Sequence, residues 1–480
     1  MRLYSTLDRK VVDIVPLKQG EISIYNCGPT VYSRMHVGNI RAYINWDILH
    51  RALVYLGFKV NRVMNFTDVG HMTADEDFGE DKIDVAARST GKDPLEISNI
   101  YIRSVLEDFH KLNILSPSGY TVNLNWEMNE LDKYGWLRAT SYIKQMIEMI
   151  ERMERNGYTY ETDLAVYFDI TKIEDYTIFT GQKLDEKSIA SREDVEVDPD
   201  KRNPADFVLW MKRVGKYENH LMHWDSPWGD GFPGWHIECS AMGIEKLGEH
   251  FDIHTGGVDH ISVHHPNERA QNIGSCGHPV VKYWVHNEFI VDGDEGKLSK
   301  SKGGALTLPE LVELGYDPLD LRYLFASVNY RVQLRFSKEA LDGARNARLK
   351  IFNRVLSLKE QSSGNGNILP EYKQRFEKAL NDNLNVSEVF AILNDILKSS
   401  NSAEDILVTV YDFDRVLGFG LEGIQKEDDI VPTEIDTLLE QRRVARENKD
   451  FMESDRLRDL ILSKGYRVLD TSNGQTVERV

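Results

Sequence analysis

The sequence predicts an α/β fold that has a parallel sheet in its first part and a helical region in its last part. An apolar run at 22–26, a helical period over 38–56 and a second apolar run at 59–66 form a strand–helix–strand pattern. Such a unit implies a parallel sheet with a right-handed crossover. Strand patterns return at 251–254 and 281–291, and helical periods dominate after residue 316. These observations predict a Rossmann-like sheet in two halves, separated by an insertion.

The remaining elements follow along the chain. Gly57 suits the end of the first helix, and residues 94–113 and 138–155 predict two further helices. Because proline favours a first helical position, we expect another helix to begin at Pro266. From about residue 117 to 229 the hydrophobic pattern is mixed, and residues 183–202 are hydrophilic and acidic. We therefore expect the two halves of the sheet domain at 1–116 and 230–315, an insertion at 117–229, a helical bundle at 316–420 and a small module at 421–480.

The last part of the chain has clear helical signals. Apolar residues at helical spacing mark one amphipathic helix: Val389, Phe390, Leu393, Ile396 and Leu397. Gly364 and Gly366 lie in a polar linker. The terminal module predicts helices over 434–448 and 450–463, a stop at Gly465 and a strand at 466–469.

Composition limits the function classes. The chain has 480 residues, enough for about three domains. It has no apolar run of the roughly 20 residues that would span a bilayer, and its polar N-terminus lacks a signal-peptide core, so we expect a cytoplasmic protein. Three cysteines exclude a disulfide framework. The net charge of −19 argues against indiscriminate RNA binding, although clusters such as Arg442, Arg443 and Arg446 can supply a local basic stripe.

A first candidate site lies where the first strand gives way to the first helix, at His36-Val37-Gly38-Asn39. Helix N-termini favour anions through their free N–H groups and the helix dipole. His36 can donate a hydrogen bond to a phosphate, and Gly38 lets a nucleotide approach the backbone. Taken alone, such a segment is more often a turn or a capped helix end.

A second candidate site is Lys297-Leu298-Ser299-Lys300-Ser301, flanked by Gly293, Gly296, Gly303 and Gly304. Two lysines three positions apart can reach one polyphosphate and stabilise negative charge at its α-phosphorus. The alternative for an isolated pentapeptide is a solvated basic turn. Glycine flanking and a preceding strand favour the functional interpretation.

Together the two segments resemble the His-Ile-Gly-His and Lys-Met-Ser-Lys-Ser signatures of class I aminoacyl-tRNA synthetases. Asn39 replaces the second histidine and Leu298 replaces methionine. The resemblance implies an ATP site, with Mg2+ accompanying the ATP. It implies catalytic roles for His36, Asn39, Lys297 and Lys300, and ATP contacts from Gly38, His36 and Lys300.

Four further residues carry donors that zinc accepts: Cys27, Cys239, His264 and Glu268. Taken singly, Cys239 or His264 is more often a buried structural residue. Segments 26–39, 64–69, 232–242, 250–269, 297–301 and 439–470 resemble the cysteinyl-tRNA synthetase family, and this resemblance implies the four-residue ligand set. His265 is the alternative to His264. Cys276 is expected to be a buried small hydrophobe.

The resemblance implies activation of L-cysteine by ATP and its transfer to tRNA(Cys), with one zinc ion per chain that selects the substrate thiol. Thr67, Trp235 and His254 are implied to bind the substrate, with packing as the competing interpretation. Arg442 and Arg446 are candidates for RNA contact, and residues 421–480 for an anticodon-binding module. We expect a monomer with no membrane partner.

Two rival functions remain. A ligase that joins cysteine to an amino sugar would share the catalytic half but lack the tRNA-binding C-terminus, so residues 434–480 argue against it. A noncatalytic zinc-dependent RNA-binding protein would not need His36 or the two lysines of the second signature.

Overall fold

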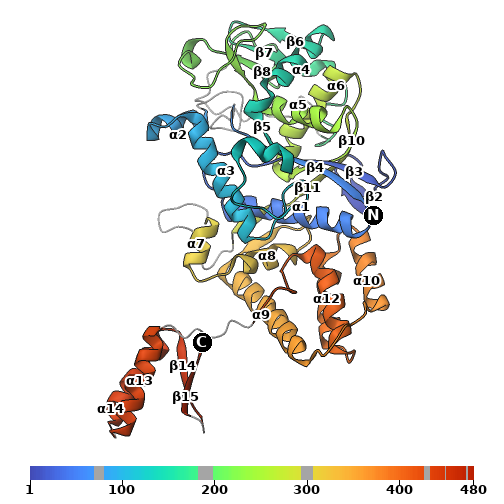
Figure 1. The fold of residues 1–480 in the computed structure, drawn as a ribbon. Helices are drawn as coiled ribbons and strands as arrows, with labels where there is room; N and C mark the ends of the chain where they lie inside the picture. Colours follow the sequence, from blue (N-terminus) through green and yellow to red (C-terminus); the bar gives the residue numbers. More distant parts are fainter. Residues whose placement is uncertain are drawn as a thin grey trace. The chain divides into compact units, whose positions relative to one another are not determined.

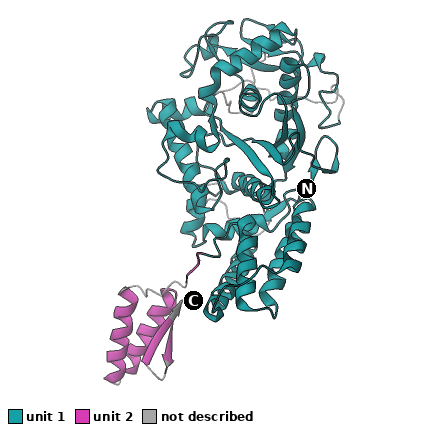
Figure 2. Cartoon of the chain, turned by 45° about the vertical axis from the view of Figure 1, so that its right-hand side comes forward, with its two compact units in different colours: residues 1–422 teal, residues 423–480 magenta. Residues whose placement is uncertain are grey.

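The structure is a computed structural model that describes residues 1–69, 81–181, 198–292, 306–425, 433–448, 450–471 and 474–479. The chain forms two compact units, Met1–Glu422 and Gly423–Val480 (Figure 2). Among the described residues, no helix combines the length and the hydrophobicity that crossing a bilayer requires.

A five-stranded sheet organises the first unit (Figure 1). All its pairings are parallel, as the sequence predicts, and the strand order is β11-β10-β3-β4-β5. The strands are β3 (Glu21–Asn26), β4 (Lys59–Phe66), β5 (Trp136–Arg138), β10 (Phe251–Gly257) and β11 (Val281–Asn287). The chain leaves β3 toward β4 on one side, and β10 pairs with β3 on the other. Ligands of open α/β sheets bind at this kind of switch point, beyond the carboxyl ends of the strands.

Helices cover both faces of the sheet. In Figure 1, α1 (Val37–Tyr55) lies below the sheet, and α5 (Trp235–Leu247) and α6 (His264–Cys276) lie above it. The helix α1 contacts β4 and β10, whereas α5 contacts β3 and β4. The predicted helix over 38–56 is thus confirmed to within a residue at each end.

The start of α6 differs from our prediction. The helix begins at His264, so Pro266 occupies its third position rather than its first. Proline is tolerated there because the first four N–H groups of a helix have no intrahelical acceptor. His264 and Glu268 therefore lie one turn apart on a single helix instead of on either side of a helix start.

Strand β5 lies within the range expected for the insertion, yet it pairs with β4. A strand of three residues is too short for its period to be recognised. The inserted region has an antiparallel sheet of its own, formed by β6 (Thr159–Glu161), β7 (Ala165–Phe168), β8 (Phe207–Lys212) and β9 (Gly231–Pro233). Further elements around it are α2 (Lys82–Thr90), α3 (Pro94–Lys111) and α4 (Ile143–Arg155), and β1 (Arg2–Ser5) pairs with β2 (Lys10–Asp13) at the N-terminus.

The predicted strand over 281–291 is broken into β11 and β12 (Ile290–Asp292), and β12 pairs with β13 (Leu334–Phe336). The expected helical region follows. It comprises α7 (Leu308–Glu313), α8 (Pro318–Ala326), α9 (Lys338–Gln361), α10 (Pro370–Asn381), α11 (Val386–Lys398) and α12 (Ala403–Leu417). Both α8 and α12 pack on α1.

A buried ion pair joins this helical region to the sheet domain. The Arg322 guanidinium of α8 lies 2.6 Å from the Asp47 carboxylate of α1, and neither side chain is exposed. Arg322 also donates to the carbonyl oxygen of Leu417 at the end of α12. These contacts thus fix α1, which covers one face of the sheet, to α8 and α12 of the helical region.

The second unit contains α13 (Thr433–Glu447), α14 (Phe451–Ser463) and a hairpin of β14 (Tyr466–Thr471) and β15 (Gly474–Arg479). The two helices and the first strand are confirmed, but we did not predict β15. Arg442 is only 4% exposed, and it donates to Asp470 and Gln475 of the hairpin. Our assignment of Arg442 to RNA contact is therefore wrong, because its guanidinium joins α13 to the hairpin. Arg446 remains half exposed beside Asp470.

Candidate active site

A pocket of about 470 Å3 lies at the carboxyl ends of β3 and β10. Cys27 enters it directly after β3, and Gly256 and Gly257 enter it at the end of β10. The first turns of α1 and α5 form further parts of the wall, as do residues 287–290. The pocket thus occupies the switch point of the sheet.

The first signature forms the N-terminal cap of α1. His36 Nδ1 accepts a hydrogen bond from the Gly38 N–H at 3.1 Å, and Asn39 Oδ1 accepts one from the His36 N–H at 3.3 Å. A Cβ atom on Gly38 would lie only 2.9 Å from the His36 ring, so a side chain there would displace the imidazole from this cap. His36, Gly38 and Asn39 all line the pocket. Asn39 therefore has a structural task in the capping box, which its amide performs without a second histidine.

The second signature, with Lys297 and Lys300, lies outside the described residues, but both of its described flanks reach the same end of the pocket. On one side, Phe289 and Ile290 line the pocket wall. On the other, the Leu306 carbonyl accepts a 2.8 Å hydrogen bond from the Val37 N–H of α1.

The candidate metal ligands converge at the opposite end, which we call the donor corner: Cys27, Cys239, His264 and Glu268. One donor atom from each lies within 4.8 Å of all the others. The four residues come from the end of β3, from α5 and from α6, and none is more than 9% exposed. More than 200 positions separate Cys27 from the other three residues in the sequence, and the fold brings them together.

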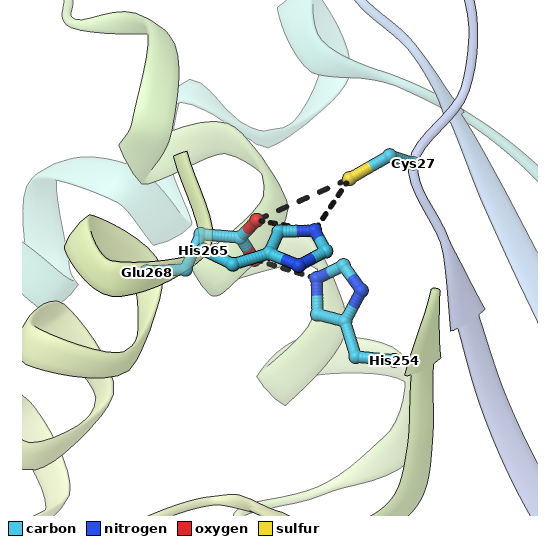
Figure 3. A group of neighbouring side chains, drawn as sticks. All are labelled: Cys27, His254, His265 and Glu268. Carbon is cyan, nitrogen blue, oxygen red and sulfur yellow. Dashed lines mark hydrogen bonds and ion pairs between the residues drawn. The ribbon is translucent and has the colours of Figure 1, made fainter. Parts of the chain in front are cut away.

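Within the described residues, a second group of donors overlaps the first: Cys27, His254, His265 and Glu268 (Figure 3). Cys27 Sγ lies 3.5 Å from His265 Nε2 and 4.0 Å from Glu268 Oε1. His254 Nε2 lies 2.7 Å from Glu268 Oε2. Either group could hold a metal ion, and both use Cys27 and Glu268.

The charges in the donor corner are strongly coupled. Burial opposes ionisation of Glu268, but His254 and His264 together lower its pKa to about 2. Burial likewise opposes the charged form of His264, yet the Glu268 carboxylate raises its pKa to about 10. The hydrogen bond with Cys27 lowers the pKa of the Cys239 thiol to about 6, whereas burial raises the pKa of Cys27. The donor corner therefore favours a positive charge between the Glu268 carboxylate and the Cys239 thiolate.

Further histidines surround the corner. His236 Nδ1 lies 2.7 Å from His264 Nδ1, which leaves His264 Nε2 facing Glu268 Oε1 at 3.0 Å. His265 Nδ1 lies 2.7 Å from His286 Nε2, and His286 Nδ1 meets the Thr6 hydroxyl at 2.7 Å. These contacts orient the imidazole rings, as supporting residues do in metal sites.

Of the residues expected to bind the substrate, Thr67 and Trp235 lie at the pocket, whereas His254 lies outside its lining. Thr67 and Trp235 line the pocket, and the Thr67 hydroxyl donates to Glu238 Oε2 at 3.0 Å. His254 is not among the described residues that line it. Its ring stacks on Trp284 behind Glu268.

Sequence reasoning missed several pocket residues: Arg34, Lys82, Asp259 and His260. Asp259 and His260 follow Gly256 and Gly257 just after β10, so a polar group at the end of a parallel strand was an available signal. Lys82 enters from α2, a placement that no local pattern reveals. Cys276 is only half-buried, and its sulfur lies 3.6 Å from Arg152 Nη2, so our description of it as a buried hydrophobe is wrong.

The class of fold follows from solved structures. The chain is similar to methionyl-tRNA synthetase of Mycobacterium tuberculosis in complex with methionyl-adenylate, with a TM-score of 0.53, 13% identity and coverage of 83% of this chain and 90% of that one. It is also similar to LeuRS of Agrobacterium radiobacter in a ternary complex, with a TM-score of 0.56, 12% identity and coverage of 85% and 84%. At these identities the likeness shows the fold alone, which is that of class I aminoacyl-tRNA synthetases.

The particular family follows from sequence comparison. Residues 13–346 match the family model of the tRNA synthetases class I (C) catalytic domain, and residues 428–477 match the cysteinyl-tRNA ligase anticodon binding domain. A cysteine–tRNA ligase of Burkholderia lata is 39% identical over 475 residues, which cover 99% of this chain and 96% of the relative. One of Treponema denticola is 38% identical, and the match covers 99% of both chains. The chain belongs to the cysteine–tRNA ligase family, a family of ATP-dependent ligases.

Proposed function

We propose that this chain joins L-cysteine to tRNA(Cys) in two steps. In the first, the cysteine carboxylate attacks the α-phosphorus of ATP, which gives cysteinyl-adenylate and releases pyrophosphate. In the second, a ribose hydroxyl of the terminal tRNA adenosine attacks the activated carbonyl and releases AMP. The observation that carries the proposal is that one pocket is lined both by the capped start of α1 and by three residues of the donor corner.

The start of α1 is the proposed phosphate end of the pocket. His36, Gly38 and Asn39 line this part of the pocket, where the positive end of the helix dipole favours the ATP phosphates, with Mg2+ accompanying them. Lys297 and Lys300 are proposed to add positive charge as it is needed at the α-phosphorus. Most of this catalysis is positioning, so the first step needs no general base.

The donor corner is the proposed recognition site for the substrate thiol. Tetrahedral zinc with ligand bonds of about 2.0–2.3 Å would hold its donors roughly 3.3–3.8 Å apart, and the donor atoms here all lie within 4.8 Å of one another. Two sulfurs, an imidazole and a carboxylate suit that ion. When bound there, zinc would bind a soft thiolate and lower its pKa, whereas a serine hydroxyl is a poor ligand.

Of the two donor groups, the one with Cys239 and His264 is favoured as the ligand set. Cys27, Cys239 and His264 all line the pocket, where a substrate atom can reach them, whereas His254 and His265 are not among its lining residues. His254 instead holds Glu268 Oε2, so that Oε1 faces two other members of this group, His264 Nε2 at 3.0 Å and Cys27 Sγ at 4.0 Å. We assign His254 and His265 to supporting this ligand set, while Thr67 and Trp235 shape the substrate pocket.

The remaining parts would bind the tRNA. The match at 428–477 supports a module that holds the anticodon, and this is the feature that an amino-sugar ligase would lack. Arg446 stays a candidate for RNA contact because its side chain is 45% exposed. The domain boundaries expected from the sequence, and a monomeric state, belong to the same proposal.

Cysteine-dependent ATP–pyrophosphate exchange tests this function, with serine and alanine as competitors and tRNA charging as the second readout. A pocket that discriminates by size alone would favour cysteine over serine by no more than roughly 200-fold. A site that binds the thiol directly should do better, so we expect exchange with serine to be at least about 10^4-fold weaker. Exchange with serine within that smaller range would refute thiol selection. Lack of any exchange in zinc-loaded protein would refute the function.

Single substitutions separate the two donor groups. His264→Ala should remove the metal, as measured by elemental analysis after dialysis against a weak chelator. His265→Ala should keep the metal with an affinity reduced by about 10–100-fold, as expected for a supporting residue. The opposite result would assign the ion to His254 and His265.

A further inference from the structure

Arg41 occupies an unusual position on α1, two residues after the first signature. Its side chain is fully buried, and its guanidinium donates only to main-chain carbonyls among its described partners. Nη1 donates to the oxygens of Glu288 and Phe289 at 3.0 and 2.7 Å. Nη2 donates to the oxygen of Asn329 at 3.3 Å and to that of Val332.

These carbonyls belong to two segments that the pocket needs. Glu288 and Phe289 lie between β11 and β12 and line the pocket. Asn329 and Val332 precede β13, the strand that pairs with β12. His36 and Asn39, at the start of α1, line the same pocket. One planar side chain therefore ties the first turns of α1 both to the pocket residues 288 and 289 and to the segment that precedes β13.

We propose that Arg41 is a positioning residue for adenylate formation, which sets the separation between the start of α1 and the wall at 287–290. The proposal rests on the proposed function, because it takes this part of the pocket as the ATP site. A misplacement of about 1 Å at such a distance from the chemistry can lower a rate roughly 100-fold. Arg41 would thus act on ATP through His36 and the main chain of residues 288 and 289 rather than by touching the nucleotide.

The fork of the guanidinium is essential to this role. Its two terminal nitrogens reach two separate segments at once, whereas a lysine carries its donors on a single nitrogen. Burial lowers the pKa of Arg41 to about 10, so the group stays protonated near neutral pH. A methionine would keep much of the volume and remove all four hydrogen bonds.

Arg62 supplies a matched control. It is 2% exposed, and it too donates to four main-chain carbonyls: those of Trp46, Leu115, Ser116 and Pro117. Burial lowers its pKa to about 10 as well. Its carbonyl partners include none of the residues 287–290. A purely structural loss should therefore be alike in the two arginines.

The experiment compares Arg41→Met, Arg41→Lys and Arg62→Met in the full-length chain by thermal unfolding and by cysteine-dependent pyrophosphate exchange. We expect all three to lower the melting temperature. Both Arg41 variants should also raise KM for ATP at least about tenfold, or lower kcat as much, while KM for cysteine stays within about twofold. Arg62→Met should leave both KM values within about twofold.

Equal kinetic effects at Arg41 and Arg62, or an Arg41→Lys variant with wild-type kinetics, would overturn the inference. If Arg41→Met does not fold, Arg41→Lys decides the matter, since it keeps the charge and loses the fork. Wild-type protein without exchange would instead refute the proposed function, so the two failures are distinguishable.

Discussion

The two ends of the pocket are built in different ways. At the donor corner, buried side chains from separate elements hold one another, as Glu268 of α6 does with His254 of β10 and His265 of α6 does with Cys27 after β3. At the phosphate end, the contacts run through the main chain: the cap of α1 and the bond from Val37 to Leu306. The first arrangement suits recognition of a single small atom, which requires donors at fixed places. The second suits a large anion, which the helix dipole favours over the whole helix start rather than at one point.

The strongest way to break this comparison is to remove a donor. Cys239→Ala should abolish metal binding and lower cysteine-dependent exchange by well over the roughly 100-fold typical of a merely supporting residue. Elemental analysis and pyrophosphate exchange measure both effects. Cys276→Ala is the control, because Cys276 lies outside both donor groups. A Cys239→Ala protein that kept one zinc per chain would show that the ligand set is wrong.

The helix α1, whose start forms the phosphate end, is held in place by a buried anchor, an ion-pair network around its own residue Asp47. The Asp47 carboxylate accepts from Arg51 at 2.8 Å and from Arg322 at 2.6 Å. Asp47→Asn leaves buried Arg322 without its counter-charge, so we expect a loss of about 3–5 kcal/mol in unfolding free energy. Denaturant titration measures it. Asp342→Asn, in an exposed pair with Lys338, should lose less than about 1 kcal/mol. Equal losses would contradict the assigned anchor.

The same anchor predicts an acid limit. Burial opposes ionisation of Asp47, but Arg51 and Arg322 lower its pKa from 3.8 to about 2. Its contribution of about 2 kcal/mol is therefore fully present above pH 4 and is lost as the pH falls toward 2. The difference in unfolding free energy between the wild type and Asp47→Asn should shrink over that window. A constant difference would rule out a lowered pKa for Asp47.

A smaller expected effect separates the two ends by chemistry. His36→Ala should lower kcat for exchange by about 100-fold, because a group that stabilises charge in the transition state is lost. Zinc content should remain that of the wild type, since His36 belongs to neither donor group. Loss of metal together with activity would mean that the two ends are not independent.

The smallest effect concerns the cap itself. Asn39→Ala removes the bond to the His36 N–H and should lower stability by about 1 kcal/mol. Asn39→Asp keeps an acceptor and should restore most of that loss in thermal unfolding. If Asn39→Ala instead lost exchange activity without any loss of stability, Asn39 would contact the substrate rather than the cap.

Long, regular elements were predictable, and short or tertiary ones were not. The strands at 22–26 and 59–66 and the helix between them have enough residues to show their period. Strand β5 has only three residues and is defined by its pairing with β4. Likewise, the exposed or buried state of Arg442 depends on a hairpin whose second strand the sequence did not reveal.

The candidate site shows the same division. Residue types and a family resemblance sufficed to name Cys27, Cys239, His264 and Glu268. The resemblance favoured His264 over its neighbour His265, a choice that residue type alone could not make. The environment of each ring depends on contacts with other elements. His236 of α5 contacts His264 Nδ1, and His286 of β11 contacts His265 Nδ1.

By itself, the sequence determined which side chains are available and where the longer strands of the sheet lie, since local periodicity and residue chemistry are written into consecutive positions. Only the tertiary structure decided that the donor corner and the capped start of α1 share one pocket, and that Arg41 joins opposing walls. The physical reason is that burial, charge coupling and the spacing of donors depend on contacts between residues more than 200 positions apart.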